Sequence, residues 1–190
     1  MDTTDTDLVL RCRNGDASAF ETLINRYKGD VFSFLVRSSG NPDVAEDLLQ
    51  ETFLKVWRSL RKYRDEGRFR SWMFSIAHIV AVDAARKDRW WKDRHLLDEG
   101  LVTRAVDSSP SVEQALQDTD LREQVRLALS DLPPKQRTVF LLRQHGDLKF
   151  REIAEITREP LNTVLSHMHY AVAKLRTVLE PIIDEWRSEG

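Results

Sequence analysis

Residues 41–94 read NPDVAEDLLQETFLKVWRSLRKYRDEGRFRSWMFSIAHIVAVDAARKDRWWKDR, and this stretch decides the fold that the rest of the chain completes. Its first half predicts an amphipathic helix, because apolar residues recur three and four positions apart. The residues expected to face the core are Ala45, Leu48, Leu49, Phe53, Val56, Trp57 and Leu60. The opposite face carries Asp47, Gln50, Glu51, Leu54 and Arg58. Leu54 is therefore an apolar residue among polar and charged groups, where a partner could cover it.

The second half of the stretch mixes aromatic with cationic residues. Its rings are Phe69, Trp72, Phe74, Trp90 and Trp91, and its cations are Arg68, Arg70, Arg86, Lys87, Arg89, Lys92 and Arg94. Rings stack on exposed bases and cations neutralise phosphates, so this composition suits a protein that holds separated DNA strands. Trp72 shares a helical stripe with Ile76, Ile79 and Val80 and is expected in the core. Phe74 points off that stripe and is the better candidate for contact with DNA.

Composition sets broad limits on the class of protein. The chain has 190 residues, enough for one or two domains, and its formal charge of −2 hides a segregation along the sequence. Residues 58–94 hold eleven Arg and Lys against five Asp and Glu, whereas residues 98–120 hold six acids against one Arg. The one cysteine, Cys12, fits a reducing compartment and is expected in the core. With no signal-peptide core at the N-terminus and no apolar run long enough for a bilayer, we expect a cytoplasmic protein.

The remaining pattern predicts an all-α fold of two small helical domains joined by a linker. We expect a domain over residues 1–94, an acidic linker over 95–111 and a second domain over 112–190. In the first, Asp16, Asp43 and Ser71 are expected to cap successive helices by accepting bonds from their first N–H groups. In the second, a short helix over 150–156, a turn through 158–160 and a long helix from Leu161 outline a helix-turn-helix.

The two faces of that long helix are predicted to have different roles. The core face holds Leu161, Val164, Met168, Ala171, Leu175 and Val178. The outward face holds Asn162, Thr163, Ser166, Tyr170 and Lys174, with His167 at the edge. Such side chains can donate to phosphates or to base edges in a major groove.

The chain resembles the extracytoplasmic-function sigma factors of bacterial RNA polymerase across almost its full length. The matching stretches, in order, are GDASAFETLINRY, AEDLLQETFLKVW, FRSWMFSIA, LPPKQRTVFLL, FREIAEI and PLNTVLSHMHYAVAKLR. Each is weak alone, but their order and spacing together are specific. The resemblance implies that the first domain is the family's region 2 and the second its region 4.

The resemblance also implies roles for particular residues. The polymerase clamp coiled coil would bind Asp47, Gln50, Glu51, Leu54, Lys55 and Arg58. The unwound −10 element would be held by Arg68, Arg70, Phe74, His78, Ile79, Arg86, Lys87 and Arg89. The −35 element would be read by Arg151, Asn162, Thr163, Ser166, His167, Tyr170 and Lys174, in a domain that also packs on the polymerase flap. The linker would thread the polymerase channels, and an anti-sigma factor would hold the protein inactive. No cofactor, metal or catalytic residue is implied.

The sequence departs from the family pattern at three places. Ile79 stands where the family usually has Asn, in the loop that receives a flipped base. Leu165, His167 and Tyr170 replace basic residues of the recognition helix, which predicts weaker and less salt-dependent −35 binding. Arg158 takes the place of the turn glycine that reaches the left-handed region at low cost, so the turn is expected to differ.

Other interpretations of the same residues stay open at this point. The Asp47 face could be an ordinary solvated helix surface, and the linker acids could be solvated charge. A stand-alone helix-turn-helix regulator would bind duplex DNA without polymerase, but it leaves the Asp47 face and the aromatic-cationic stretch unexplained. An enzyme is disfavoured, because no phosphate loop, nucleophile pair or metal cluster stands out. His167 and His169 lie two positions apart, on different helix faces, which disfavours a metal site.

Overall fold

The computed structural model describes residues 3–64, 67–95 and 115–189, and within them the side chains of 3–64, 67–87 and 123–181. This part of the chain folds into helices and contains no strand, which confirms the all-α prediction. The helices are α1 (Asp5–Arg13), α2 (Ala17–Ser39), α3 (Pro42–Leu60), α4 (Phe69–His95), α5 (Ala115–Ser130), α6 (Pro134–Gln144), α7 (Phe150–Thr157) and α8 (Leu161–Glu189). Nearly all of the predicted linker lies outside the described residues.

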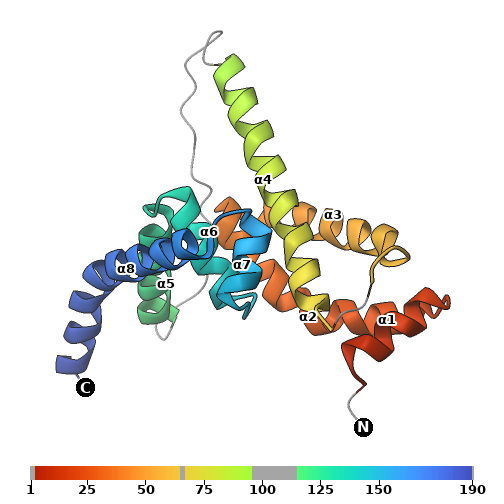
Figure 1. The fold of residues 1–190 in the computed structure, drawn as a ribbon. Helices are drawn as coiled ribbons and strands as arrows, with labels where there is room; N and C mark the ends of the chain where they lie inside the picture. Colours follow the sequence, from red (N-terminus) through yellow and green to blue (C-terminus); the bar gives the residue numbers. More distant parts are fainter. Residues whose placement is uncertain (1–2, 65–66, 96–114, 190) are drawn as a thin grey trace.

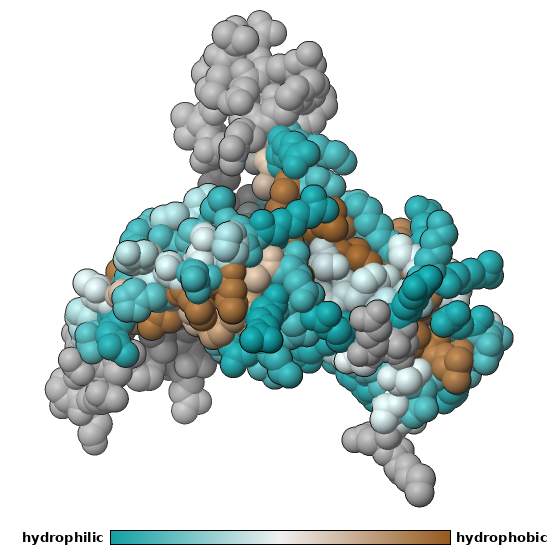
Figure 2. All heavy atoms as spheres, viewed as in Figure 1, coloured by the Kyte–Doolittle hydropathy of each residue, from teal (hydrophilic) through white to brown (hydrophobic). Residues whose placement is uncertain are grey.

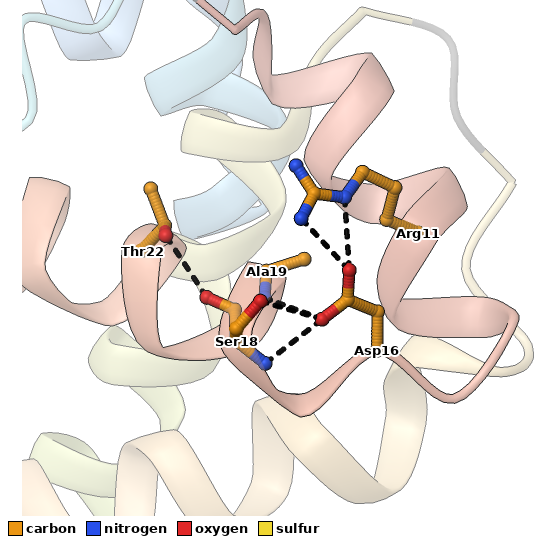
Figure 3. A network of polar contacts seen from close by, with 5 residues as sticks. All are labelled: Arg11, Asp16, Ser18, Ala19 and Thr22. Atoms are coloured by element: carbon orange, nitrogen blue, oxygen red, sulfur yellow. Dashed lines mark hydrogen bonds and ion pairs between the residues drawn. The ribbon is translucent and has the colours of Figure 1, made fainter.

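Helix α2 begins where the sequence predicts. The Asp16 carboxylate accepts hydrogen bonds from the backbone N–H groups of Ser18 and Ala19, at 3.0 and 3.2 Å. Its other oxygen accepts from Arg11, which ties the end of α1 to the start of α2 (Figure 3). These bonds, first those from Ser18 and Arg11, lower the pKa of Asp16 to about 2. Asp16 therefore joins two helices as well as capping one.

Two predicted caps are wrong. Asn41, not Asp43, caps α3, because its side-chain oxygen accepts from the N–H groups of Asp43 and Val44 while Pro42 takes the first helical position. Ser71 is buried inside α4, which begins two residues earlier, at Phe69. Helix α4 continues to His95. In Figure 1 its second half rises away from the rest of the molecule.

The core of the N-terminal domain changes the interpretation of α4. The predicted stripe places Ile79 inside, but its side chain is 49% exposed. Phe74, expected at the surface, is 0% exposed and meets Phe34 of α2 edge-on, with ring centroids 5.8 Å apart. Helix α4 contacts both α2 and α3, so it buries a wider arc than one stripe allows. That arc holds Phe69, Met73, Phe74, Ala77 and Val80.

The C-terminal domain packs α5, α6 and α7 against α8. Val139 and Leu142 of α6, Ile153 of α7 and Val164 of α8 are fully buried at its centre. Pro134 opens α6 at its first turn, where its missing N–H group costs no hydrogen bond. The predicted inward face of α8 holds as far as Leu175, but Val178 is 40% exposed. Leu179, one position further on, is still partly buried against the core.

The two domains touch each other. Helix α2 contacts α6, and the first half of α4 contacts α7. Figure 1 shows α6 and α7 lying against the N-terminal domain while α8 points away from it. This contact places the start of α4 beside the end of α6 and beside α7, both of which are far from it in sequence.

Candidate functional site

An apolar groove of about 840 Å³ lies between α2 and α3. The ring of Phe20 and the indole of Trp57 form one wall, with centroids 4.6 Å apart. The other apolar side chains that line the groove are Ala17, Ile24, Phe32, Leu49, Phe53 and Leu54. Leu54 is 54% exposed, as predicted, whereas Trp57, expected in the core, is 43% exposed. The sequence predicts a helix face here, and the structure adds the α2 side that turns the face into a groove.

On the α3 side, Glu46 and Gln50 are the polar residues that line the groove. Asp47, Glu51 and Arg58 are exposed on the same helix, which agrees with its predicted outward face. Lys55 and Glu51 form an ion pair of 2.8 Å along that face. From α2, Asn25 and Lys28 add polar groups to the opposite edge. An apolar floor with a charged border is the usual anatomy of a protein-binding surface.

The predicted single-strand surface on α4 is only partly available. Arg86 and Lys87 are exposed, and Arg86 lies 4.0 Å from Asp83 on the same helix. Ile79 is exposed as well, whereas Phe74 is buried and cannot stack on a base without unfolding the core. His78 is half-buried, and that burial lowers the pKa of its imidazole. The side chains of Arg89, Trp90 and Trp91 lie outside those described.

Figure 2 shows hydrophobic side chains at the surface beside α4, on a face that is otherwise mostly hydrophilic. Among the side chains described for this helix, up to residue 87, the large apolar residues that are exposed are Ile79 and Val82. They lie three positions apart, so they share one side of α4 with nearby Arg86.

Arg68 and Arg70, also predicted to hold DNA, are engaged within the protein. Arg70 pairs with Asp30 of α2 at 2.7 Å and lies over the rings of Tyr27 and Phe74. It also donates to the backbone carbonyls of His145 and Gly146, in the C-terminal domain. Arg68 forms an ion pair of 2.9 Å with Glu155 of α7. Nothing in the local sequence signals these contacts, which join residues from 40 to 87 positions apart.

Helices α7 and α8 form the predicted helix-turn-helix, and its turn keeps the left-handed conformation. Arg158 ends α7 with φ 57° and ψ 39°, so an arginine adopts the geometry expected of glycine. The expected change in the turn is therefore absent, and the chain accepts a strained residue instead. On α8, the predicted contacts Asn162, Ser166 and Tyr170 are exposed, and Thr163 is half-buried. On α7, Arg151 is exposed.

Two predicted DNA contacts on α8, one half-buried and one exposed, face neighbouring groups of the same domain. The Nε2 atom of His167 is buried and lies 3.4 Å from Glu159, which also pairs with Lys135 at 2.7 Å. The Lys174 ammonium donates to the carbonyl of Asp131 at the end of α5, at 2.5 Å. Both side chains hold the C-terminal domain together in this structure.

Two features of the described residues bear on other functions. No three His, Cys, Asp or Glu side chains in this part of the chain gather as ligands for a metal ion. None of the described helices is both long and apolar enough to cross a bilayer.

Comparison with known proteins agrees with this arrangement. The Sigma-70 region 2 family matches residues 23–91, and the Sigma-70 region 4 family matches residues 122–175. The chain is 30% identical over 188 residues to the ECF RNA polymerase sigma-E factor of Haemophilus influenzae, covering 95% of this chain and 97% of that protein. This chain belongs to the extracytoplasmic-function sigma factors. It is also 27% identical over 179 residues to sigma factor SigW of Bacillus subtilis, covering 92% of this chain and 96% of SigW.

Solved structures of sigma factors share the fold. RpoE of Bartonella quintana, in complex with the anti-sigma factor NepR, matches with a TM-score of 0.68 and 22% identity, over 85% of this chain and 96% of that one. CnrH, in complex with the cytosolic domain of CnrY, matches with a TM-score of 0.65 and 22% identity, over 92% of this chain and 96% of that one. The N-terminal domain of this sigma factor is thus its region 2 and the C-terminal domain its region 4.

Proposed function

We propose that this sigma factor binds core RNA polymerase through the α2–α3 groove and directs promoter recognition and melting. The observation that carries the proposal is the groove itself, because an apolar floor that exposes Leu54 and Trp57 needs a protein to cover it. Gln50 lines the groove, and Asp47, Glu51, Lys55 and Arg58 would add polar contacts from the same helix. A helix of the polymerase clamp that lays an apolar ridge between α2 and α3 fits this shape.

We assign promoter contacts to two separate surfaces. Ile79, Arg86, Lys87 and Arg89 of α4, with Arg68 and Arg70 once these are released, would hold the unwound −10 element. Arg151, Asn162, Thr163, Ser166 and Tyr170 would read the −35 element from the helix-turn-helix. Few cations remain on this face of α8, so the −35 contact contributes little phosphate neutralisation and is weak by itself.

We also propose that an anti-sigma factor holds the protein inactive until a signal removes it. RpoE was solved with the anti-sigma factor NepR bound, and CnrH with the cytosolic domain of CnrY bound. The groove that would receive polymerase offers the same apolar surface to an inhibitor, so the two partners would compete. The protein would act in the cytoplasm as a binding subunit, without catalysis of its own.

Run-off transcription tests the proposal directly. Core polymerase with this protein on fragmented genomic DNA should produce start sites that core polymerase alone does not. The matched control is the Leu54→Asp variant, which keeps the fold and places a charge on the floor of the groove. Equal start sites with and without the protein would sink the proposal.

The competing function is a regulator that binds duplex DNA without polymerase. The two hypotheses differ in affinity. A sigma factor should bind core polymerase tightly and duplex DNA negligibly when alone. Specific, tight binding of promoter duplex by the isolated protein would favour the regulator.

A further inference from the structure

We propose that region 4 closes on region 2 and withholds Arg70 and Arg68 from single-stranded DNA, so that the unbound protein inhibits itself. This inference rests on the proposed function, because it takes the start of α4 as a surface for the unwound strand. It adds an equilibrium between closed and open arrangements of regions 2 and 4, which the proposed function alone does not require.

Arg70 is the centre of the closed contact. Its Nε donates to the Gly146 carbonyl at 2.5 Å, and its Nη2 donates to the His145 carbonyl at 3.1 Å and to Asp30 at 2.7 Å. The Nε and Nη2 groups form the edge of a guanidinium that grips a phosphate in bidentate fashion. In the closed protein both of these groups already donate hydrogen bonds within the protein. A DNA phosphate would therefore have to displace region 4 to bind them.

The two acceptor carbonyls, of His145 and Gly146, lie at a place where a positive charge is stabilising. His145 follows the last residue of α6, and the carbonyls at a helix C-terminus lack partners and carry the negative end of the helix dipole. Only glycine fits at position 146 in this turn, because a Cβ there would lie 2.4 Å from the carbonyl oxygen of Leu142. Region 4 thus presents a pair of main-chain oxygens, to which Arg70 of region 2 donates.

A second contact closes the same surface from the side of α7. Glu155 pairs with Arg68 at 2.9 Å, and Glu155 and Ile156 border a cleft whose other residues, including Tyr63 and Trp72, belong to region 2. Helix α7 is the first helix of the helix-turn-helix. Closure therefore places a DNA-reading element of region 4 directly on the predicted single-strand surface of region 2.

Closure and single-strand binding then exclude each other. The apparent affinity for a single strand falls in proportion to the fraction of molecules that are open. By thermodynamic reciprocity, a bound single strand must also open the domains. These two consequences give two independent measurements.

The opening variant is Glu155→Lys, which sets a second cation against Arg68 without altering any residue assigned to DNA. Its matched control is Glu123→Lys, which makes the same charge change on α5, where Glu123 pairs only locally with Arg126. The distance between domains is measured with spin labels at Glu21→Cys of α2 and Arg176→Cys of α8, in a Cys12→Ala background. Anisotropy of a short fluorescein-labelled A/T oligonucleotide reports single-strand affinity.

We expect Glu155→Lys to lengthen the distances between the labels and to bind the oligonucleotide about tenfold more tightly than Glu123→Lys. We also expect the oligonucleotide to lengthen those distances in the wild-type protein. Unchanged distances in the variant, or equal affinities of the two variants, would overturn the inference. Run-off transcription by the wild-type protein tests the proposed function separately, because loss of closure leaves its start sites in place.

Discussion

The indole of Trp57 lies against the ring of Phe20, with centroids 4.6 Å apart and planes inclined by 55°, and this contact joins α3 to α2 along the wall of the groove. A ring pair of this kind is rigid and half-exposed, which suits an anchor for a partner's apolar side chain. It also explains why a tryptophan at a core-like position of α3 is not in the core. The groove, rather than the domain interior, is the place that Trp57 fills.

Placing a charge in the groove should weaken polymerase binding. We expect Leu54→Asp to reduce affinity for core polymerase by about 2 kcal/mol, roughly thirtyfold, because central apolar contacts dominate such interfaces. Titration of labelled protein with core polymerase measures this. Leu10→Asp is the control, since Leu10 is similarly exposed but lies on α1, away from the groove. Equal losses in both variants would contradict the assignment of the groove.

Phe74 should contribute to stability and not to DNA binding. We expect Phe74→Ala to lower the free energy of unfolding by about 3–5 kcal/mol, because the ring is fully buried against Phe34. Ile79→Ala, on the exposed side of the same helix, should change stability by no more than about 0.5 kcal/mol. Urea denaturation followed by circular dichroism compares the two variants. A Phe74→Ala protein as stable as the wild type would mean that the ring is at the surface.

The case of Phe74 shows how far sequence reasoning reaches for this chain. Helical periodicity correctly predicts the exposed face of α3 around Asp47, because that helix buries one stripe. It misplaces Phe74 and Ile79, because α4 packs against two helices and its buried arc depends on where both lie. Asn41 and Asp43 are both good caps, and only the position of Pro42 decides between them. The pairing of Arg70 with a turn of region 4 has no local signal at all.

Replacing Arg158 with glycine should make the protein more stable. Its φ of 57° lies in the region where a Cβ is unfavourable and glycine is not. We expect Arg158→Gly to raise the free energy of unfolding by about 0.5–1 kcal/mol. This net value allows for the larger conformational entropy that glycine gives to the unfolded chain. Thermal denaturation measures the change. Arg158→Ala is the control, since alanine keeps the Cβ and should bring no gain.

The closed arrangement of the domains should weaken on acidification. Burial, with Arg37 of α2 next, lowers the pKa of His145, while Asp30 of α2 acts in the opposite sense. The open form therefore takes up a proton at higher pH than the closed form. Closure is then fully favoured above the ordinary value of 6.5 and is lost progressively as pH falls below it.

The distance between the spin labels, measured from pH 7.5 down to about pH 5.5, tests this dependence. His145→Gln cannot take up the proton, so it should flatten the part of the profile that His145 contributes. The pKa of His78 in α4 is also lowered by burial, and its share should remain in the variant. A profile that the substitution leaves unchanged would rule out His145 as the group responsible.

The oxygens that receive Arg70 belong to the main chain of residues 145 and 146. Every amino acid carries such a carbonyl, so a substitution at either position alters the contact only by bending the turn. Evolution can therefore tune this inhibition through Arg70, Asp30 or the course of the chain, but it cannot delete the acceptors by exchanging a side chain. Relatives can therefore form the same contact between regions 2 and 4 while sharing few of the residues around it. A position-by-position comparison of aligned sequences would not reveal that contact.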